Sequence, residues 1–72
     1  MRTMIIYRNK DDQIIDVTFK SEEMTYDELR NKITEYNNIG ENKATTEAIP
    51  DYLYDVILFH KKVIDNHLNE SL

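Results

Sequence analysis

Apolar residues in the C-terminal third of the chain recur with the period of an α-helix. When residues are placed about 100° apart, the segment from Pro50 to Asn69 is apolar over roughly half of its circumference. This arc is wider than the stripe of about 100° that is typical of a surface helix. It contains Tyr52, Leu53, Val56, Ile57, Phe59, Val63, Ile64 and Leu68, with His60 and His67 at its centre. We therefore expect a helix over about 50–69 that is both the spine of the core and the contact surface for a second subunit.

The N-terminal part of the chain predicts a β-hairpin over about residues 2–20. Two segments rich in β-branched and aromatic residues, Thr3–Arg8 and Ile14–Phe19, are separated by a polar run. The run contains no glycine, which favours a four-residue loop built on a type I turn over a tighter turn.

Alternation in the second strand defines an apolar side of this hairpin. Ile15, Val17 and Phe19 face one way, and the residues between them face the other. Because opposed residues of an antiparallel pair share a face, Met4 and Ile6 are expected opposite Val17 and Ile15, or opposite Phe19 and Val17. We expect this side to face the core, since the opposite side mixes apolar and polar residues.

A second helix is predicted over about residues 26–39. Thr25 and Glu28 have the spacing of a capping box, in which each side chain reaches the backbone N–H of the other residue. Met24 and Leu29 flank this cap as a hydrophobic staple. Gly40, the only glycine, stands where a left-handed residue often ends a helix. The helix has a narrow apolar stripe formed by Tyr26, Leu29, Ile33 and Tyr36.

Residues 40–49 show no convincing period and are predicted to be a linker. Pro50 fits the first turn of the last helix, where its missing N–H is tolerated. The order of elements is therefore ββαα in a single small α+β domain spanning residues 1–72, with the hairpin packed on two helices.

Size and composition restrict what this domain can be. A chain of 72 residues buries only about 60% of its unfolded surface, and it contains no cysteine that could form a disulfide. Association between copies is the remaining aid to stability, so we expect a homodimer. No apolar run approaches a membrane span, and the absence of cysteine fits a cytoplasmic protein. The formal net charge of −5, with a pI near 4.8, makes nucleic acid an unfavourable partner.

Carboxylates are concentrated in the first half of the chain. This charge predicts a surface that binds a basic protein, although a turn and a helix N-terminus also favour acidic residues. The spacing matches no calcium-binding loop. The acidic residues are Asp11, Asp12, Asp16, Glu22, Glu23, Asp27 and Glu28.

The last helix carries the predicted self-association surface. His60 and His67 are about 10.5 Å apart along a helix, too far to share one zinc ion, so we expect no metal site. Imidazole gains charge as the pH falls through about 6.5, so protonation would weaken an interface containing these residues. Tyr54 and Leu58 fall outside the apolar arc. The residues expected to mediate self-association are Tyr52, Val56, Phe59, His60, Val63 and His67.

No arrangement of residues indicates catalysis. The chain has no cysteine nucleophile and no glycine-rich phosphate loop, and no histidine lies between a nucleophile and an orienting acid in the predicted elements. We therefore expect neither an enzyme nor a cofactor. The preferred hypothesis is a small acidic interaction module that binds and modulates a host protein. A composition rich in Ile, Asn, Lys, Asp and Glu is typical of AT-rich bacterial, phage or mobile-element genes.

Two other classes of function fit the same order of elements. Val17–Lys20 followed by two helices loosely resembles the ribbon-helix-helix repressors, whose dimers place a β-ribbon in the major groove of DNA. The resemblance implies that Asp16, Thr18 and Lys20 read bases. The chain departs from that family in its preceding strand, its longer interhelix connection and its acidic residue on the reading face. The remaining alternative is a structural subunit of a larger assembly.

Overall fold

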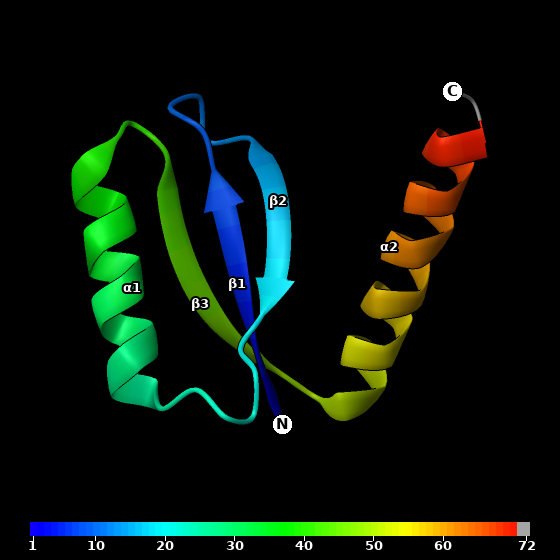
Figure 1. The fold of residues 1–72 in the computed structure, drawn as a ribbon, viewed down its shortest axis with the longest axis horizontal. Coiled ribbons are helices and arrows are strands. Elements are labelled where there is room, and N and C mark those ends of the chain that lie inside the picture. Colours follow the sequence, from blue (N-terminus) through cyan, green and yellow to red (C-terminus); the bar gives the residue numbers. More distant parts are fainter. Residues whose placement is uncertain (71–72) are drawn as a thin grey trace.

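The structure is a computed structural model that describes the backbone of residues 1–70 and the side chains of residues 1–67. Three antiparallel strands form one sheet in the order β2-β1-β3, and two helices complete an α+β fold (Figure 1). This confirms the predicted class, the N-terminal hairpin and the C-terminal helix as the longest element. The elements are β1 (Arg2–Arg8), β2 (Ile14–Phe19), α1 (Tyr26–Ile39), β3 (Lys43–Ile49) and α2 (Asp51–Glu70).

Strand β3 occupies the segment that was predicted to be a linker, and that prediction is wrong for residues 43–49. The strand pairs with β1 along its whole length, from Arg8 opposite Lys43 to Arg2 opposite Ile49, which makes β1 the central strand. The segment has few large apolar side chains because the residues that it turns toward α1 are small. The strand therefore depends on pairing with β1, and its own pattern of apolar and polar residues does not predict a strand.

The β1–β2 pairing follows one of the two predicted registers, with Met4 opposite Phe19 and Ile6 opposite Val17. The predicted four-residue loop is wrong. Asp12 N–H donates to the Asn9 carbonyl at 3.0 Å, and Asp12 has a φ of 63°, the left-handed conformation that closes a three-residue hairpin turn. The register shifts next to Arg8, and Ile15 is the extra residue of a β-bulge.

Helix α1 packs on the face of the sheet that carries Ile5 and Tyr7. Ile5, Leu29 and Ala44 form a buried cluster, with Met24, Tyr7, Ile33 and Tyr36 packed against it. The predicted apolar side with Ile15, Val17 and Phe19 faces α2 and not α1, and Ile6 and Ile49 are buried on it. Alanine and threonine on β3 leave space there for Leu29, whereas the far face of β3 carries Lys43, Thr45 and Glu47. We call the two sides of the sheet the α1 face, with Ile5, Tyr7, Thr18 and Ala44, and the far face, with Arg2, Met4, Ile6, Val17, Phe19 and Ile49.

Helix α1 begins after Thr25 as predicted, with the Thr25 half of the predicted capping box, but its C-terminus differs from the prediction. The Glu28 N–H donates to Thr25 Oγ1 at 3.1 Å, which satisfies one of the free amides of the first turn. Gly40 has a φ of −140°, so the predicted left-handed cap is absent. Lys43 Nζ instead donates to the Asn37 carbonyl in the last turn, where a cation also suits the helix dipole.

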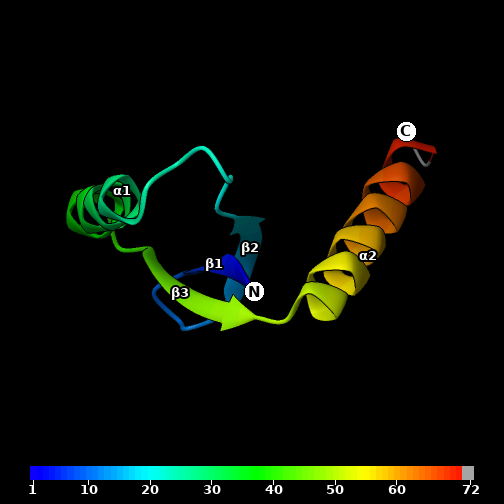
Figure 2. The same ribbon diagram turned by 90° about the horizontal axis from the view of Figure 1, so that it is seen from below.

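Helix α2 stands beyond β2, on the opposite side of the sheet from α1 (Figures 1 and 2). It begins at Asp51, and the Pro50 carbonyl accepts from the N–H groups of Leu53 and Tyr54. The prediction that this helix is the spine of the core is wrong. The buried apolar residues of the described chain are Ile5, Ile6, Leu29, Ala44 and Ile49, on β1, α1 and β3.

Candidate interaction surface

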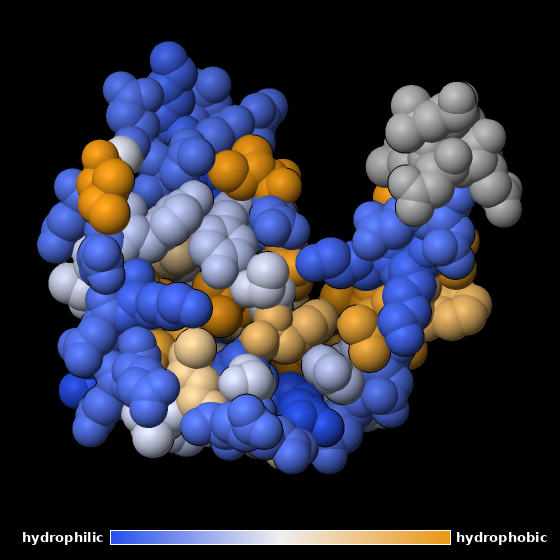
Figure 3. All heavy atoms as spheres, in the orientation of Figure 1, coloured by the Kyte–Doolittle hydropathy of each residue, from blue (hydrophilic) through white to orange (hydrophobic). Residues whose placement is uncertain are grey.

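Helix α2 has one side turned toward the sheet and one turned away from it. Half-buried residues on the inner side are Leu53, Tyr54, Ile57, Leu58 and Lys61. The outer side is exposed over Tyr52 (72%), Val56 (48%), Phe59 (64%) and Val63 (47%). Apolar surface is visible at the outer edge of α2 (Figure 3). Most of the predicted self-association surface is therefore free in the monomer.

An aromatic contact holds the N-terminal half of α2 against the sheet. The ring of Tyr54 meets the ring of Phe19 edge to face, with centroids 4.7 Å apart and an interplanar angle of 78°. The Arg2 guanidinium lies 4.7 Å from the centroid of the same tyrosine ring. Such aromatic and cation–π contacts each contribute about 0.5–1.5 kcal/mol. Tyr54 thus belongs to the intramolecular contact, which explains why it lies outside the apolar arc.

Lys61 holds the second half of α2 at the free edge of β2. Its ammonium donates to the Val17 carbonyl at 2.7 Å and lies 3.7 Å from the Asp16 carboxylate. The Val17 N–H donates to the same Asp16 carboxylate at 2.8 Å. Because Lys20 N–H bonds to the Thr3 carbonyl, alternation along the antiparallel pair points the backbone groups of Val17 away from β1. Both outward groups of Val17 are therefore satisfied, and the strand edge is blocked against pairing with another chain at this residue.

The predicted acidic surface is divided between two ends of the domain. Asp11 and Asp12 lie in the hairpin turn, whereas the loop before α1 and its first turn lie at the opposite end (Figure 1). Asp16 is engaged by Lys61. The structure thus brings four of the seven predicted acidic residues into one region. These four residues are Glu22, Glu23, Asp27 and Glu28.

Several of these carboxylates already have basic neighbours. Glu22 accepts from Arg2 at 2.9 Å, and Asp27 lies 3.9 Å from Arg30. Glu23 and Glu28 are exposed, and neither carboxylate forms an ion pair with any described residue. These two residues are the carboxylates in this region that are available to an external cation.

Both histidines lie on the exposed part of α2. The ring of His60 contacts the ring of Phe59, with centroids 5.9 Å apart. His67 is exposed near the end of the described side chains, and the side chain of Leu68 lies beyond them. Within residues 1–67, no cluster of three His, Asp or Glu side chains could hold a metal ion.

The three residues that would read DNA in a ribbon-helix-helix protein have different surroundings here, and Asp16 is exposed beside Lys61. Thr18 Oγ1 is 3.1 Å from the Tyr7 hydroxyl on the α1 face. Lys20 lies 4.8 Å from the centroid of the Tyr26 ring and donates to the Ser21 carbonyl. Thr18 and Lys20 thus lie on the side of the sheet that faces α1, and a role of these residues in binding DNA stays a prediction.

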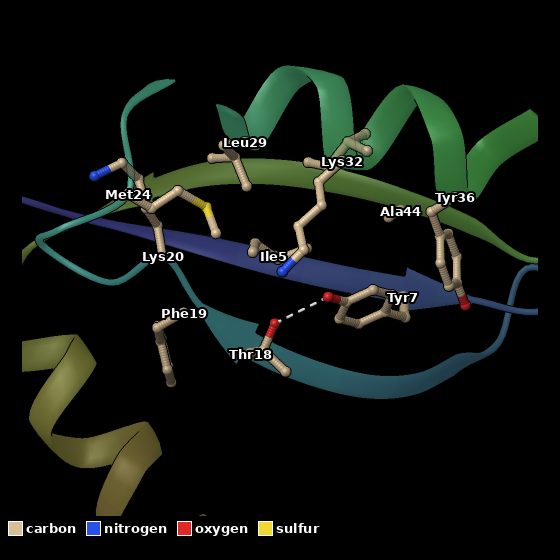
Figure 4. Close-up of a pocket in the computed structure, with 11 residues that line it drawn as sticks. Ile5, Tyr7, Thr18, Phe19, Lys20, Met24, Leu29, Lys32, Tyr36 and Ala44 are labelled. Carbon is tan, nitrogen blue, oxygen red and sulfur yellow. Dashed lines mark hydrogen bonds between the residues drawn. The ribbon is translucent and has the colours of Figure 1, made fainter. Parts of the chain in front are cut away.

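A hollow of about 340 Å³ remains between α1 and β2. It exists because α1 contacts β3 and lies away from β2, so that one flank of the core is open (Figure 4). Tyr7 and Thr18 form the hydrogen bond at its floor, and Lys32 reaches over it. The lining is mainly apolar, and its charged residues are Lys20 and Lys32.

Comparison with models of known protein families, with curated proteins and with solved structures found no match. None of the helices within the described residues is both long enough and apolar enough to span a bilayer.

Proposed function

We propose that this chain is a non-catalytic protein-interaction module that self-associates through the outer side of α2. The observation that carries the proposal is the exposure of Tyr52, Val56, Phe59 and Val63 on a helix whose opposite side is anchored to β2. Contact of such an apolar side with water is unfavourable, and the free energy falls when a partner covers it. A small domain without disulfides gains stability from the same association.

In this proposal the module also engages a basic host protein. Glu23 and Glu28, which lack ion-pair partners among the described residues, support a binding surface at the start of α1. A negative surface raises the association rate with a positive partner and disfavours nucleic acid. We place the interaction in the cytoplasm of a bacterial host, because the absence of cysteine fits a reducing compartment and the composition is typical of AT-rich phage or mobile-element genes.

The decisive experiment is the Phe59→Asp variant. Phe59 is 64% exposed, so a charge at this position leaves the monomer folded and removes self-association. Light scattering over a range of micromolar concentrations is expected to show a mass that rises toward the dimer for the unmodified chain and stays monomeric for the variant. Circular dichroism checks that both are folded. A monomer at all concentrations for the unmodified chain would refute self-association.

A further inference from the structure

The outer side of α2 has the spacing of a coiled-coil seam. Tyr52, Val56, Phe59 and Val63 are separated by four, three and four residues, the alternation of a and d positions in a heptad repeat. They cluster within roughly 60° of the helix circumference, opposite Tyr54 and Lys61 on the anchored side. A partner helix can therefore lie along this seam without meeting the sheet.

Charged residues along one border of the seam determine the direction of the partner. Asp55 and Lys62 occupy successive g positions next to the seam. Both are exposed, and neither forms an ion pair with another described residue. The other border carries Leu53 and His60 at the e positions.

A second copy in antiparallel orientation matches these charges. In an antiparallel pair, g positions face g positions, so Lys62 meets Asp55 of the other copy twice about the two-fold axis. In the same register Phe59 packs against Val56, and Val63 packs against Tyr52, so that all four seam residues are covered. A parallel pair would instead place Asp55 near His60, and Lys62 near His67, which provides no carboxylate for the lysine.

We infer that the partner of this surface is a second copy of the chain, bound through α2 as an antiparallel helix pair centred between Ile57 and Leu58. This inference rests on the proposed self-association and adds its direction and register. The four layers between Tyr52 and Val63 span about 17 Å of helix. The contact is short, so the monomer and dimer exchange readily in the micromolar range of concentrations.

Charge exchange at the g positions tests the register. Lys62→Glu places two like charges opposite each other at both ends of the contact and is expected to weaken association about five- to tenfold. Adding Asp55→Lys to this variant exchanges the pair and is expected to restore association to within about twofold. Lys10→Glu, in the hairpin turn, is the matched control with the same change in net charge. The register is wrong if Lys62→Glu weakens association no more than Lys10→Glu does, or if the double variant is not restored.

Single cysteines test the direction, because the chain contains none of its own. In the antiparallel pair the two Val63 positions are about 17 Å apart along the helix axis, too far for a disulfide, whereas Val63 lies beside Tyr52 of the other copy. A mixture of Tyr52→Cys and Val63→Cys chains is therefore expected to form mixed disulfides, and neither chain alone does so. Rapid disulfide formation by Val63→Cys alone would establish a parallel pair and overturn this inference while leaving self-association intact. A monomeric unmodified chain would instead refute the underlying proposal.

Discussion

Lys61 is the residue that most directly sets the orientation of α2. It and its neighbour Lys62 look equivalent in the sequence, but they project to different sides of the helix. Lys61 bonds to the Val17 carbonyl and to Asp16. Lys62 is exposed beside the seam. The two lysines therefore have different roles, because Lys61 contacts the edge of β2 and Lys62 does not.

Replacing Lys61 by alanine is expected to loosen α2 from the sheet. The variant loses a charge-assisted hydrogen bond and exposes the edge of β2, and we expect a stability loss of about 1 kcal/mol after allowance for solvent screening. Hydrogen exchange should accelerate in α2 more than in β1. Lys62→Ala, studied at concentrations where the chain is monomeric, is the control and should change stability by less than about 0.5 kcal/mol. Equal acceleration of exchange in both variants would contradict the anchoring role.

Asn37 performs a comparable task at the other edge of the sheet. Its side-chain amide accepts from the Ala44 N–H at 2.6 Å and donates to the Ala44 carbonyl at 3.1 Å. The side chain thus imitates a neighbouring strand at the free edge of β3. Single polar side chains from the two helices therefore block one position on each edge of the sheet, a common protection against edge-to-edge aggregation.

At the scale of elements, the core depends on the contact of α1 with β1 and β3. Leu29 is only 4% exposed and occupies the centre of the buried cluster. The open flank beside β2 means that few other side chains can compensate for its loss.

Leu29→Ala is expected to lower the free energy of unfolding by about 2–4 kcal/mol, because it removes buried methyl groups and leaves a cavity. That loss is a large fraction of the stability of a domain of this size. Urea denaturation followed by circular dichroism measures it. Ile39→Ala is the matched control on the same helix, since Ile39 is 78% exposed, and it should change stability by less than about 0.5 kcal/mol. Comparable losses in both variants would show that α1 does not pack as described.

At the scale of the whole molecule, two different surfaces serve two proposed contacts. The outer side of α2 is the proposed apolar contact between copies, and the acidic end near α1 is the proposed charged contact for another protein. Glu23 and Glu28 lie before α1 and in its first turn, whereas the outer side of α2 is turned away from the sheet, so the two surfaces are on different elements.

Neutralising the acidic end is expected to weaken binding to a basic partner more than neutralising the hairpin turn does. A synthetic lysine-rich peptide is a suitable probe at low ionic strength, where exposed charges are least screened. Glu23→Gln with Glu28→Gln should reduce its affinity several-fold. Asp11→Asn with Asp12→Asn makes the same change in net charge at the other end and is the control. If the two double variants weaken binding equally, net charge alone explains the binding of the peptide, and the proposed surface at the start of α1 is refuted.

Features with local causes could be predicted from the sequence. The start of α1 follows from Thr25 and Glu28, which are three residues apart. One of the two predicted hairpin registers was correct because alternation restricts the pairing of Ile6 to residues on the apolar side of β2. The length of the turn was not predictable, because the bulge at Ile15 compensates for its odd number of residues.

Three features were decided only by tertiary structure. Strand β3 is made of small and polar residues, and its extended conformation depends on pairing with β1. These two segments are far apart in the sequence, so the local pattern of residues does not predict the contact. The face covered by α1 depends on the space above Ala44, and so on the same pairing. The apolar arc of α2 was evident in the sequence. It was also evident that this arc is wider than the rest of the domain can cover. Its outward direction follows from Tyr54 and Lys61, which lie outside that arc and bind the helix to β2 by its opposite side.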